Sequence, residues 1–218
     1  VGPLTLDNYP SYIRAVALCK IACARANVEI GALDSEKAKY IEMAAREVAD
    51  GKFKGEFVVN IYRGSGTPTN MIVNEVVAHR ANELMVGSKT GPIHPNTHVN
   101  MCQSTNDLIP TAKEMVVYDE LGKVIEAAGY FAEAFEKKAE EFADVIKMGR
   151  TCLQDAVPLT LGQEFGAYGH AARRLEKRLK IEREHWNKSC LGGTAVGTGM
   201  SCLPGFRAVI AEKLTEVC

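Results

Sequence analysis

A long stretch of helical periodicity dominates the middle of the sequence. From about Asn106 to Lys147, apolar residues recur mostly at spacings of three and four, which is the period of one face of an α-helix. The residues of this stripe are Val117, Leu121, Val124, Ala128, Phe131, Phe135, Phe142 and Val145. A single helix of this length would extend for roughly 60 Å, well beyond the usual globular helix. Because such a stripe needs partner helices, the sequence predicts a bundle of long helices.

Shorter helices are predicted on either side of this stretch. We predict them at residues 10–28, from Asp34 or Ser35 to about Gly51, at residues 70–84 and from Pro158 to about His185, with a short extended piece at residues 57–62. In the long helix, Gly122 and Gly129 lie on one face, where each costs about 1 kcal/mol relative to alanine. Glycine at these two positions therefore predicts a close approach of another helix backbone.

The composition narrows the functional classes. The 218 residues are 46% hydrophobic, enough for a core, and their formal net charge is −1. A chain with interspersed Lys and Glu offers no field for nucleic acid or an anionic membrane, and no apolar run reaches the roughly 20 residues of a membrane span. Seven cysteines without a CxxC pair favour reduced thiols and a cytoplasmic location. Cys19 and Cys23 lie one helical turn apart, but without further ligands nearby they indicate no metal site.

Polar residues gather directly before the long helix. Ser104, Thr105, Asn106 and Asp107 precede its first turn, which contains Pro110. Hydroxyls, an amide and unpaired backbone N–H groups at the positive end of a helix dipole can hold an anion without any cationic side chain. The alternative is ordinary N-capping, which the same residue types perform.

Two further turns have similar chemistry. They are GSGTPTN at residues 64–70 and GRTC at residues 149–152, and each carries hydroxyls and leads toward a helix. Together with residues 104–107 they predict a site rich in neutral donors, which suits a small dicarboxylate whose charge increases during reaction. The glycine-rich segments at residues 86–91 and 191–199 lack the spacing or the GKS/GKT ending of a phosphate loop, so neither indicates a nucleotide site.

Four segments, in the right order along the chain, resemble the fumarase/aspartase superfamily. They are GSGTPTNMIVNEVVAHRA (64–81), HPNTHVNMCQSTNDLIPTA (94–112), KMGRTCLQDAVPLTLGQEF (147–165) and LGGTAVGTG (191–199). The resemblance implies an all-α fold with little or no β-structure, a central bundle of long helices and assembly as a homotetramer. Residues 1–105 would form a partial N-terminal helical domain leading into the bundle, and residues 106–218 its first long helices. The implied chemistry is anti-elimination from a succinyl-type substrate without an organic cofactor.

Two positions relate the chain to one branch of the superfamily. CQSTND at residues 102–107 resembles aspartase, whereas class II fumarases usually read SQSSND. Fumarases have His after GRT and aspartases accept Gln or His, but this chain has Cys152, which copies neither group well. The resemblance favours aspartate ammonia-lyase, which forms fumarate and ammonia through an aci-carboxylate intermediate. Class II fumarase and a non-catalytic helical assembly module are the alternatives.

The resemblance also assigns roles to individual residues. The implied substrate contacts are Ser65, Thr67, Ser104, Thr105, Asn106, Thr151 and Cys152, with Thr151 joining from a neighbouring subunit. A second anion site would include His94 and Asn96, although Thr97 stands where fumarases have Asp. The other role open to His94 is structural, as a cap.

The superfamily's catalytic base lies in a glycine- and serine-rich loop of the type GSSxMPxKxNP. No such segment occurs in the 218 residues, so we expect this chain to contain no catalytic base and to be inactive alone. A fragment, a truncated gene product and one chain of a split protein are the three explanations. The reading frame downstream of Cys218 would decide between an enzyme and an assembly module. A small dicarboxylate and further copies of the chain are the expected partners, while nucleic acid and membranes are not.

Overall fold

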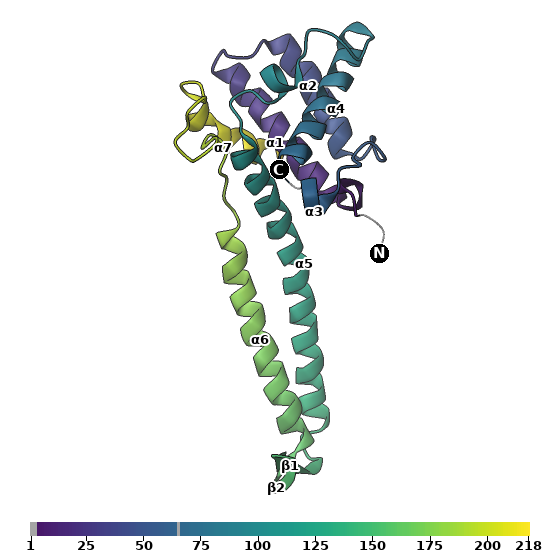
Figure 1. The fold of residues 1–218 in the computed structure, drawn as a ribbon. Helices are drawn as coiled ribbons and strands as arrows, with labels where there is room; N and C mark the ends of the chain where they lie inside the picture. The colour runs from purple at the N-terminus through teal and green to yellow at the C-terminus, as the bar shows by residue number, and fades with distance from the viewer. Residues whose placement is uncertain (1–3, 65) are drawn as a thin grey trace. The chain divides into compact units, whose positions relative to one another are not determined.

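The computed structural model describes residues 4–64 and 66–218. These residues are mainly helical and contain one two-stranded sheet, which confirms the predicted fold class. They form two compact units (Figure 1). The first contains the described residues up to Val116 together with Lys188–Cys218, and the second contains Val117–Asn187. The predicted division at residues 105 and 106 thus falls inside the first unit. In the described part of the chain, no helix is both long and apolar enough to cross a bilayer.

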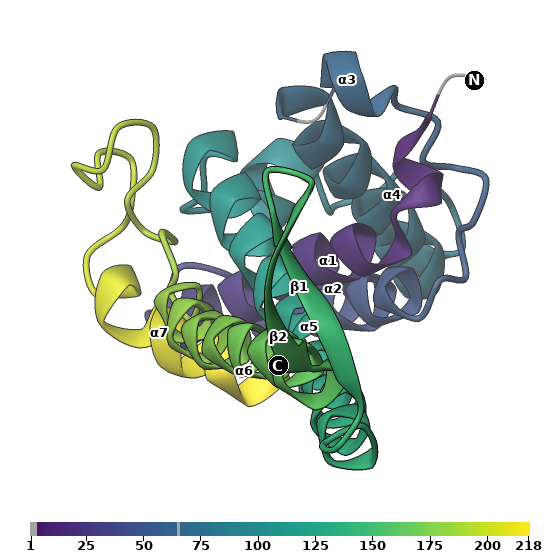
Figure 2. The same ribbon diagram turned by 90° about the horizontal axis from the view of Figure 1, so that it is seen from below.

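Helix α1 (Pro10–Glu29) lies in the core of the first unit. It packs against α2 (Ser35–Ala49), α4 (Thr67–Val86) and α7 (Phe206–Val217), as Figures 1 and 2 show. Because three helices cover it, α1 buries fourteen of its residues, among them Val16 and Ile21, which have no exposed surface. The helix predicted at residues 10–28 is confirmed.

The helix ends of the first unit mostly follow their sequence signals. Asp34 caps α2 by accepting a hydrogen bond from the Lys37 backbone N–H at 3.0 Å, as predicted. Gly87 ends α4 in the left-handed conformation, with a φ of 75°. The extended piece predicted at residues 57–62 is shorter, because Ile61–Gly64 form the short helix α3. Leu6–Asn8 (η1) and Pro95–Val99 (η2) form two further short helical segments.

The long helix α5 (Thr105–Glu141) begins in the first unit, and its residues from Val117 onward belong to the second. The second unit continues with an antiparallel hairpin of β1 (Ile146–Thr151) and β2 (Gln154–Thr160), followed by α6 (Leu161–His185). The predicted helix thus ends at Glu141 rather than at Lys147. Pro158 lies in β2 and does not start a helix.

Two local sequence features explain why a β-hairpin separates the two helices. A Cβ on Gly149 would lie 2.7 Å from the carbonyl oxygen of Val157, so glycine allows the two strands to approach at an irregular point of their pairing. Helix α6 starts with a capping box, in which the Thr160 hydroxyl accepts from the Gln163 backbone N–H and the Gln163 side chain accepts from that of Thr160. Both signals lie in the sequence, but they are weaker than the helical periodicity on either side.

Helices α5 and α6 approach each other closely at Gly162. A Cβ there would lie 2.5 Å from the carbonyl oxygen of Ala139. The predicted backbone contacts at Gly122 and Gly129 are wrong, because charged side chains face both positions. The guanidinium of Arg183 lies 3.5 Å from a Cβ placed on Gly122, and a glutamate carboxylate lies 3.4 Å from one on Gly129. Long side chains, rather than a backbone, occupy the space that these two glycines leave.

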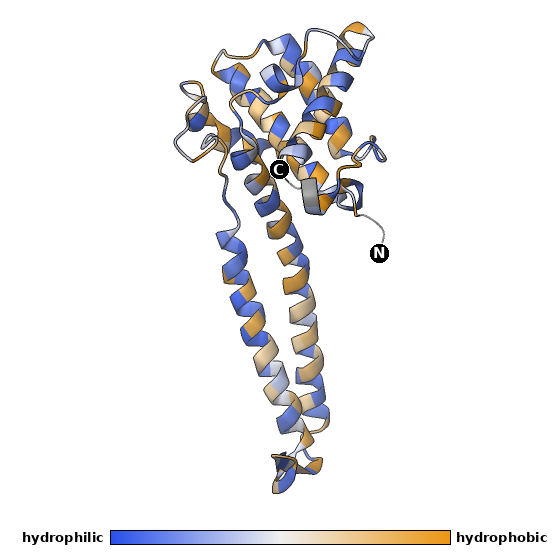
Figure 3. Cartoon of the chain, in the orientation of Figure 1, coloured by the Kyte–Doolittle hydropathy of each residue, from blue (hydrophilic) through white to orange (hydrophobic). Residues whose placement is uncertain are grey.

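Several apolar side chains of α5 and α6 are exposed. Phe131 is 58% exposed, Leu175 54% and Ile181 65%. Figure 3 shows hydrophobic residues spread along both helices, among charged ones. Large exposed side chains such as Phe131 need a covering surface if they belong to one contiguous patch, which other protein chains can provide. The predicted need for further partner helices therefore applies to this unit.

Candidate active site

Two side-chain hydrogen bonds cap the start of α5. The Ser104 hydroxyl accepts from the Asn106 backbone N–H at 3.2 Å, and the Asp107 carboxylate accepts from the Ser104 backbone N–H at 2.8 Å. The capping role considered for these residues is therefore present. A serine oxygen that accepts a hydrogen bond still has its own proton to donate, so capping leaves Ser104 able to bind an anion.

Asp107 also fastens a second segment to this helix start. Its other carboxylate oxygen accepts from the backbone N–H groups of Gly192, at 3.1 Å, and Thr194, at 2.8 Å. Asp107 is 1% exposed, and its three N–H partners satisfy it in place of a cation. The glycine-rich segment at residues 191–199 is thus held directly beside the start of α5. Sequence reasoning excluded a nucleotide site there but missed this structural role.

Asn70 joins the first two polar turns. Its side-chain nitrogen donates to the Thr105 hydroxyl oxygen at 3.1 Å. Gly66, which caps α4, lies close by, since a Cβ placed on it would be 4.0 Å from the methyl group of Thr105. The start of α4 and the start of α5 therefore lie close together, each with the positive end of its helix dipole. Thr67 is the first residue of α4 and is exposed. The predicted contact Ser65 lies outside the described residues.

Asn106 is exposed at the same helix start. Its side-chain nitrogen donates to the carbonyl oxygen of Ala195 at 2.8 Å. Because a carbonyl oxygen only accepts, this contact fixes the amide orientation and leaves the Asn106 Oδ1 atom as an acceptor. The glycine-rich segment thus orients a predicted substrate contact.

Sequence reasoning missed Lys20, which lies behind these turns. It is 0% exposed, and its ammonium donates to the side-chain oxygens of Asn70 at 2.7 Å, Asn100 at 3.0 Å and Gln103 at 2.8 Å. Burial lowers the pKa of Lys20 to about 7. A signal was present in the sequence, because Lys20 lies four residues after Val16, on the apolar face of the predicted helix.

Thr151 and Cys152 belong to the second unit, whereas the two facing turns belong to the first. Both are exposed at the turn between β1 and β2, where Cys152 and Leu153 have φ values of 50° and 62°. The Thr151 hydroxyl contacts the Cys152 sulfur at 4.0 Å. The structure does not bring them together with the other predicted contacts within either unit.

His94 has the capping role that was one of its two alternatives. Its Nδ1 atom accepts from the backbone N–H groups of Asn96 and Thr97, each at 3.2 Å, at the start of η2. Both His94 and Asn96 are exposed. Within the described residues, no group of three His, Cys, Asp or Glu side chains is arranged to hold a metal ion.

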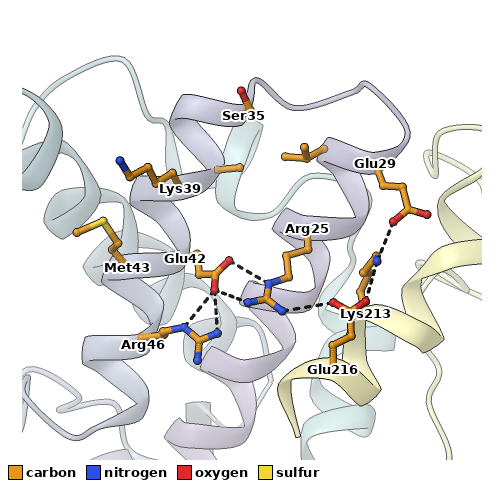
Figure 4. Close-up of a pocket in the computed structure, with 11 residues that line it drawn as sticks. Arg25, Glu29, Ser35, Lys39, Glu42, Met43, Arg46, Lys213 and Glu216 are labelled. Carbon is orange, nitrogen blue, oxygen red and sulfur yellow. Dashed lines mark hydrogen bonds and ion pairs between the residues drawn. The ribbon is translucent and has the colours of Figure 1, made fainter.

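A cleft of about 670 Å³ lies elsewhere in the first unit, between α1, α2 and α7 (Figure 4). Its Arg25 pairs with Glu42 at 2.5 Å and with Glu216 at 3.4 Å, and its Lys213 pairs with Glu29 and Glu216. Because carboxylates of the chain itself hold these cations, the cleft is less suited to a dicarboxylate than the facing turns are.

A family model described as lyase matches residues 6–218. The chain belongs to this lyase family. The four segments that resemble the fumarase/aspartase superfamily lie within the matched region, so the predicted superfamily is confirmed.

Relatives of this chain carry two enzyme names. An aspartate ammonia-lyase from a Bacillus species is 46% identical over 212 residues, which cover 95% of this chain and 45% of that protein. Fumarate hydratase class II 2 of Bradyrhizobium diazoefficiens is 43% identical over 217 residues, which cover 97% of this chain and 46% of that protein. The crystal structure of class II fumarase from Schistosoma mansoni superposes with a TM-score of 0.88 at 37% identity, covering 95% of this chain and 44% of that one. The chain thus spans about half the length of the curated relatives it matches.

Proposed function

We propose that this chain supplies a dicarboxylate-binding part of an ammonia-lyase that converts L-aspartate into fumarate and ammonia. The observation that carries the proposal is the facing arrangement of the Gly66 turn and the Thr105 hydroxyl, joined through Asn70 at 3.1 Å. Two helix starts and a hydroxyl provide neutral donors for one carboxylate. Sequence similarity to an aspartate ammonia-lyase supports the same reaction.

In this reaction a base removes a proton from the carbon beside the β-carboxylate. The electron pair moves into that carboxylate and gives an aci-carboxylate dianion, and its return breaks the carbon–nitrogen bond and releases ammonia. Donors placed around the carboxylate bind the dianion more strongly than the substrate, which is how they lower the barrier. Thr67, Ser104 and Thr105 are the side chains that we assign to this task, with Thr151 and Cys152 contributed by another copy of the chain.

The orientation of Asn106 favours an amino acid as substrate. With its nitrogen held by Ala195, its side-chain oxygen is an acceptor for the three N–H groups of the substrate ammonium. A hydroxyl can also donate to this oxygen, but with one proton instead of three. Class II fumarase, with malate as substrate, is the second candidate because a class II fumarate hydratase matches at 43% identity.

Ligand titration followed by NMR tests the proposal on the chain itself. We would add L-aspartate, L-malate or L-alanine to the isotope-labelled chain, with alanine as the control that lacks one carboxylate. The backbone signals of Thr67, Thr105 and Asn106 should shift with aspartate, and those of α2 should not. Saturation by malate at lower concentrations than by aspartate would favour the fumarase. The absence of a shift with either dicarboxylate would refute the proposed site.

Catalysis is a separate question from binding. Because the sequence contains no GSSxMPxKxNP segment, we propose that the 218-residue chain forms no fumarate from aspartate on its own. Fumarate absorbance would follow the reaction directly, and appreciable turnover by the purified chain would contradict this. A chain that neither binds nor converts a dicarboxylate would instead support the non-catalytic assembly module.

A further inference from the structure

The three acceptors of Lys20 come from two segments that flank the candidate site. Asn70 lies in the first turn of α4, while Asn100 and Gln103 directly precede the Ser104 cap of α5. Within the described part of the chain, no carboxylate lies within ion-pair distance of this ammonium. A buried charge without a counter-ion is costly unless hydrogen bonds satisfy it. The amide oxygens that do so belong to the segments that must face one another for a ligand to bind.

The ammonium also determines how these amides are oriented. It has three donors and no acceptor, and the three side-chain oxygens use all of them. Each amide must therefore turn its nitrogen away from Lys20. The Asn70 nitrogen then donates to the side-chain oxygen of Asn100 and to the Thr105 hydroxyl oxygen, both at 3.1 Å. The Gln103 nitrogen donates to backbone carbonyl oxygens at 3.0 and 3.1 Å.

This series of hydrogen bonds ends at Thr105. Its hydroxyl oxygen accepts from Asn70, and the hydroxyl makes no other hydrogen bond with the described residues. The proton of this hydroxyl is thus left for an acceptor outside the network. At a helix start that faces a second helix start, the acceptor best suited to it is a carboxylate oxygen.

We propose that Lys20 is a positioning residue, whose ammonium fixes the Asn70 amide and so directs the Thr105 hydroxyl proton toward the bound carboxylate. The role of the bound dicarboxylate rests on the function proposed above. The orientation of Asn70 does not depend on it. A neutral amine in place of the ammonium would have two protons and one lone pair, and one amide oxygen would lose its donor.

The protonation state of Lys20 can change near neutral pH. Burial lowers its pKa to about 7, and the nearby Asp107 carboxylate favours the charged form. Cys19 and Cys23 lie on α1 beside it, and Asp107 lies on α5. Burial raises the pKa of the Cys19 thiol to about 12, so this thiol stays neutral in the range where Lys20 titrates. Carboxylate binding should therefore weaken as the pH rises through about 7.

The first experiment needs no ligand. NMR would measure hydrogen exchange of the Asn70 side-chain amide in the unaltered chain, in Lys20→Met and in Lys39→Met. Lys39 is the matched control because it is an exposed lysine on α2. We expect slow exchange in the unaltered chain and in the control, and faster exchange in Lys20→Met. Equal protection in all three would overturn the proposal. Should Lys20→Met fail to fold, loss of protection in the unaltered chain on raising the pH through about 7 would support the proposal, and unchanged protection would refute it.

The second experiment separates positioning from general stability. Succinate affinity would be measured for Lys20→Met, Thr105→Val and the double variant. Each single variant should bind about tenfold more weakly, because each loses the same charge-assisted hydrogen bond. The double variant should bind no more weakly than either single one, and Thr105→Val should lose the dependence of affinity on pH near 7. Additive losses would contradict the proposal. If succinate binds neither the unaltered chain nor any variant, the proposed function fails. The amide exchange experiment still decides the role of Lys20 in that case.

Discussion

The side-chain nitrogen of Asn70 donates to the hydroxyl oxygen of Thr105 at 3.1 Å, which ties the first turn of α4 to the first residue of α5. This hydrogen bond holds the starts of α4 and α5 together, so that their polar groups form one surface. The same bond orients a hydroxyl that would otherwise rotate freely. A site assembled this way depends on a small number of buried polar residues, and each can be tested separately.

Removal of the Asp107 carboxylate should weaken the first unit. The change Asp107→Ala leaves the buried N–H groups of Gly192 and Thr194 without their acceptor. Because each unsatisfied buried group costs about 1–3 kcal/mol, we expect unfolding in urea to require about 2–4 kcal/mol less free energy. Asp119→Ala, on the exposed surface of α5, is the control. A loss below about 0.5 kcal/mol would show that the glycine-rich segment is held by other contacts.

Stability should rise with pH just above neutrality. The pKa of Lys20 is lowered to about 7 by burial, so between this value and the ordinary 10.5 the unfolded chain binds the proton and the folded chain releases it. Stability therefore increases as the pH rises, by about 1–2 kcal/mol between pH 7 and 8.5. Urea unfolding at several pH values would measure the slope. The slope should disappear in Lys20→Met, and a slope that persists in this variant must come from another group.

Gly162→Ala should destabilise the helix hairpin of the second unit. The new methyl group would lie 2.5 Å from the carbonyl oxygen of Ala139, and a backbone atom cannot move aside without shifting the helix. We expect a loss of about 1–3 kcal/mol. Gly166→Ala is the matched control, because its methyl group would meet only the Ala139 side chain at 3.7 Å, an ordinary contact. Thermal unfolding should show Gly166→Ala at or above the stability of the unaltered chain, given the higher helix propensity of alanine. Similar losses in both variants would argue against the backbone contact.

The chain should associate with itself through the second unit. Phe131, on α5, is 58% exposed and Leu175, on α6, 54%. Sedimentation velocity should show oligomers at micromolar concentration, and Phe131→Glu should shift the distribution toward the monomer. Lys137→Glu changes the charge at an exposed polar site nearby and should have little effect. A stable monomer of the unaltered chain would contradict the expectation.

Local signals allowed much of the fold to be predicted, while the site was predicted only in part. Helices α1 and α2 follow from periodicity and caps, because both depend on residues a few positions apart. The β1–β2 hairpin was missed, since Gly149 and Pro158 are also common helix boundaries. Thr105 and Asn106 were identified because the motif that contains them is one continuous segment of the sequence. Lys20 was not identified, because its hydrogen-bond acceptors lie 50 to 83 residues away in the sequence.

The bonds from Asp107 to Gly192 and Thr194 also order the events of folding. They join residues 85 and 87 positions apart, with the whole helix hairpin between them. Closure of so long a loop has a high entropic cost and belongs to the slow part of a folding reaction. During synthesis on the ribosome, α1, α2 and α4 can pack long before residue 194 emerges, whereas Asp107 accepts from the Gly192 and Thr194 N–H groups only afterwards. The polar surface that would bind a carboxylate is therefore among the last parts of the first unit to become native.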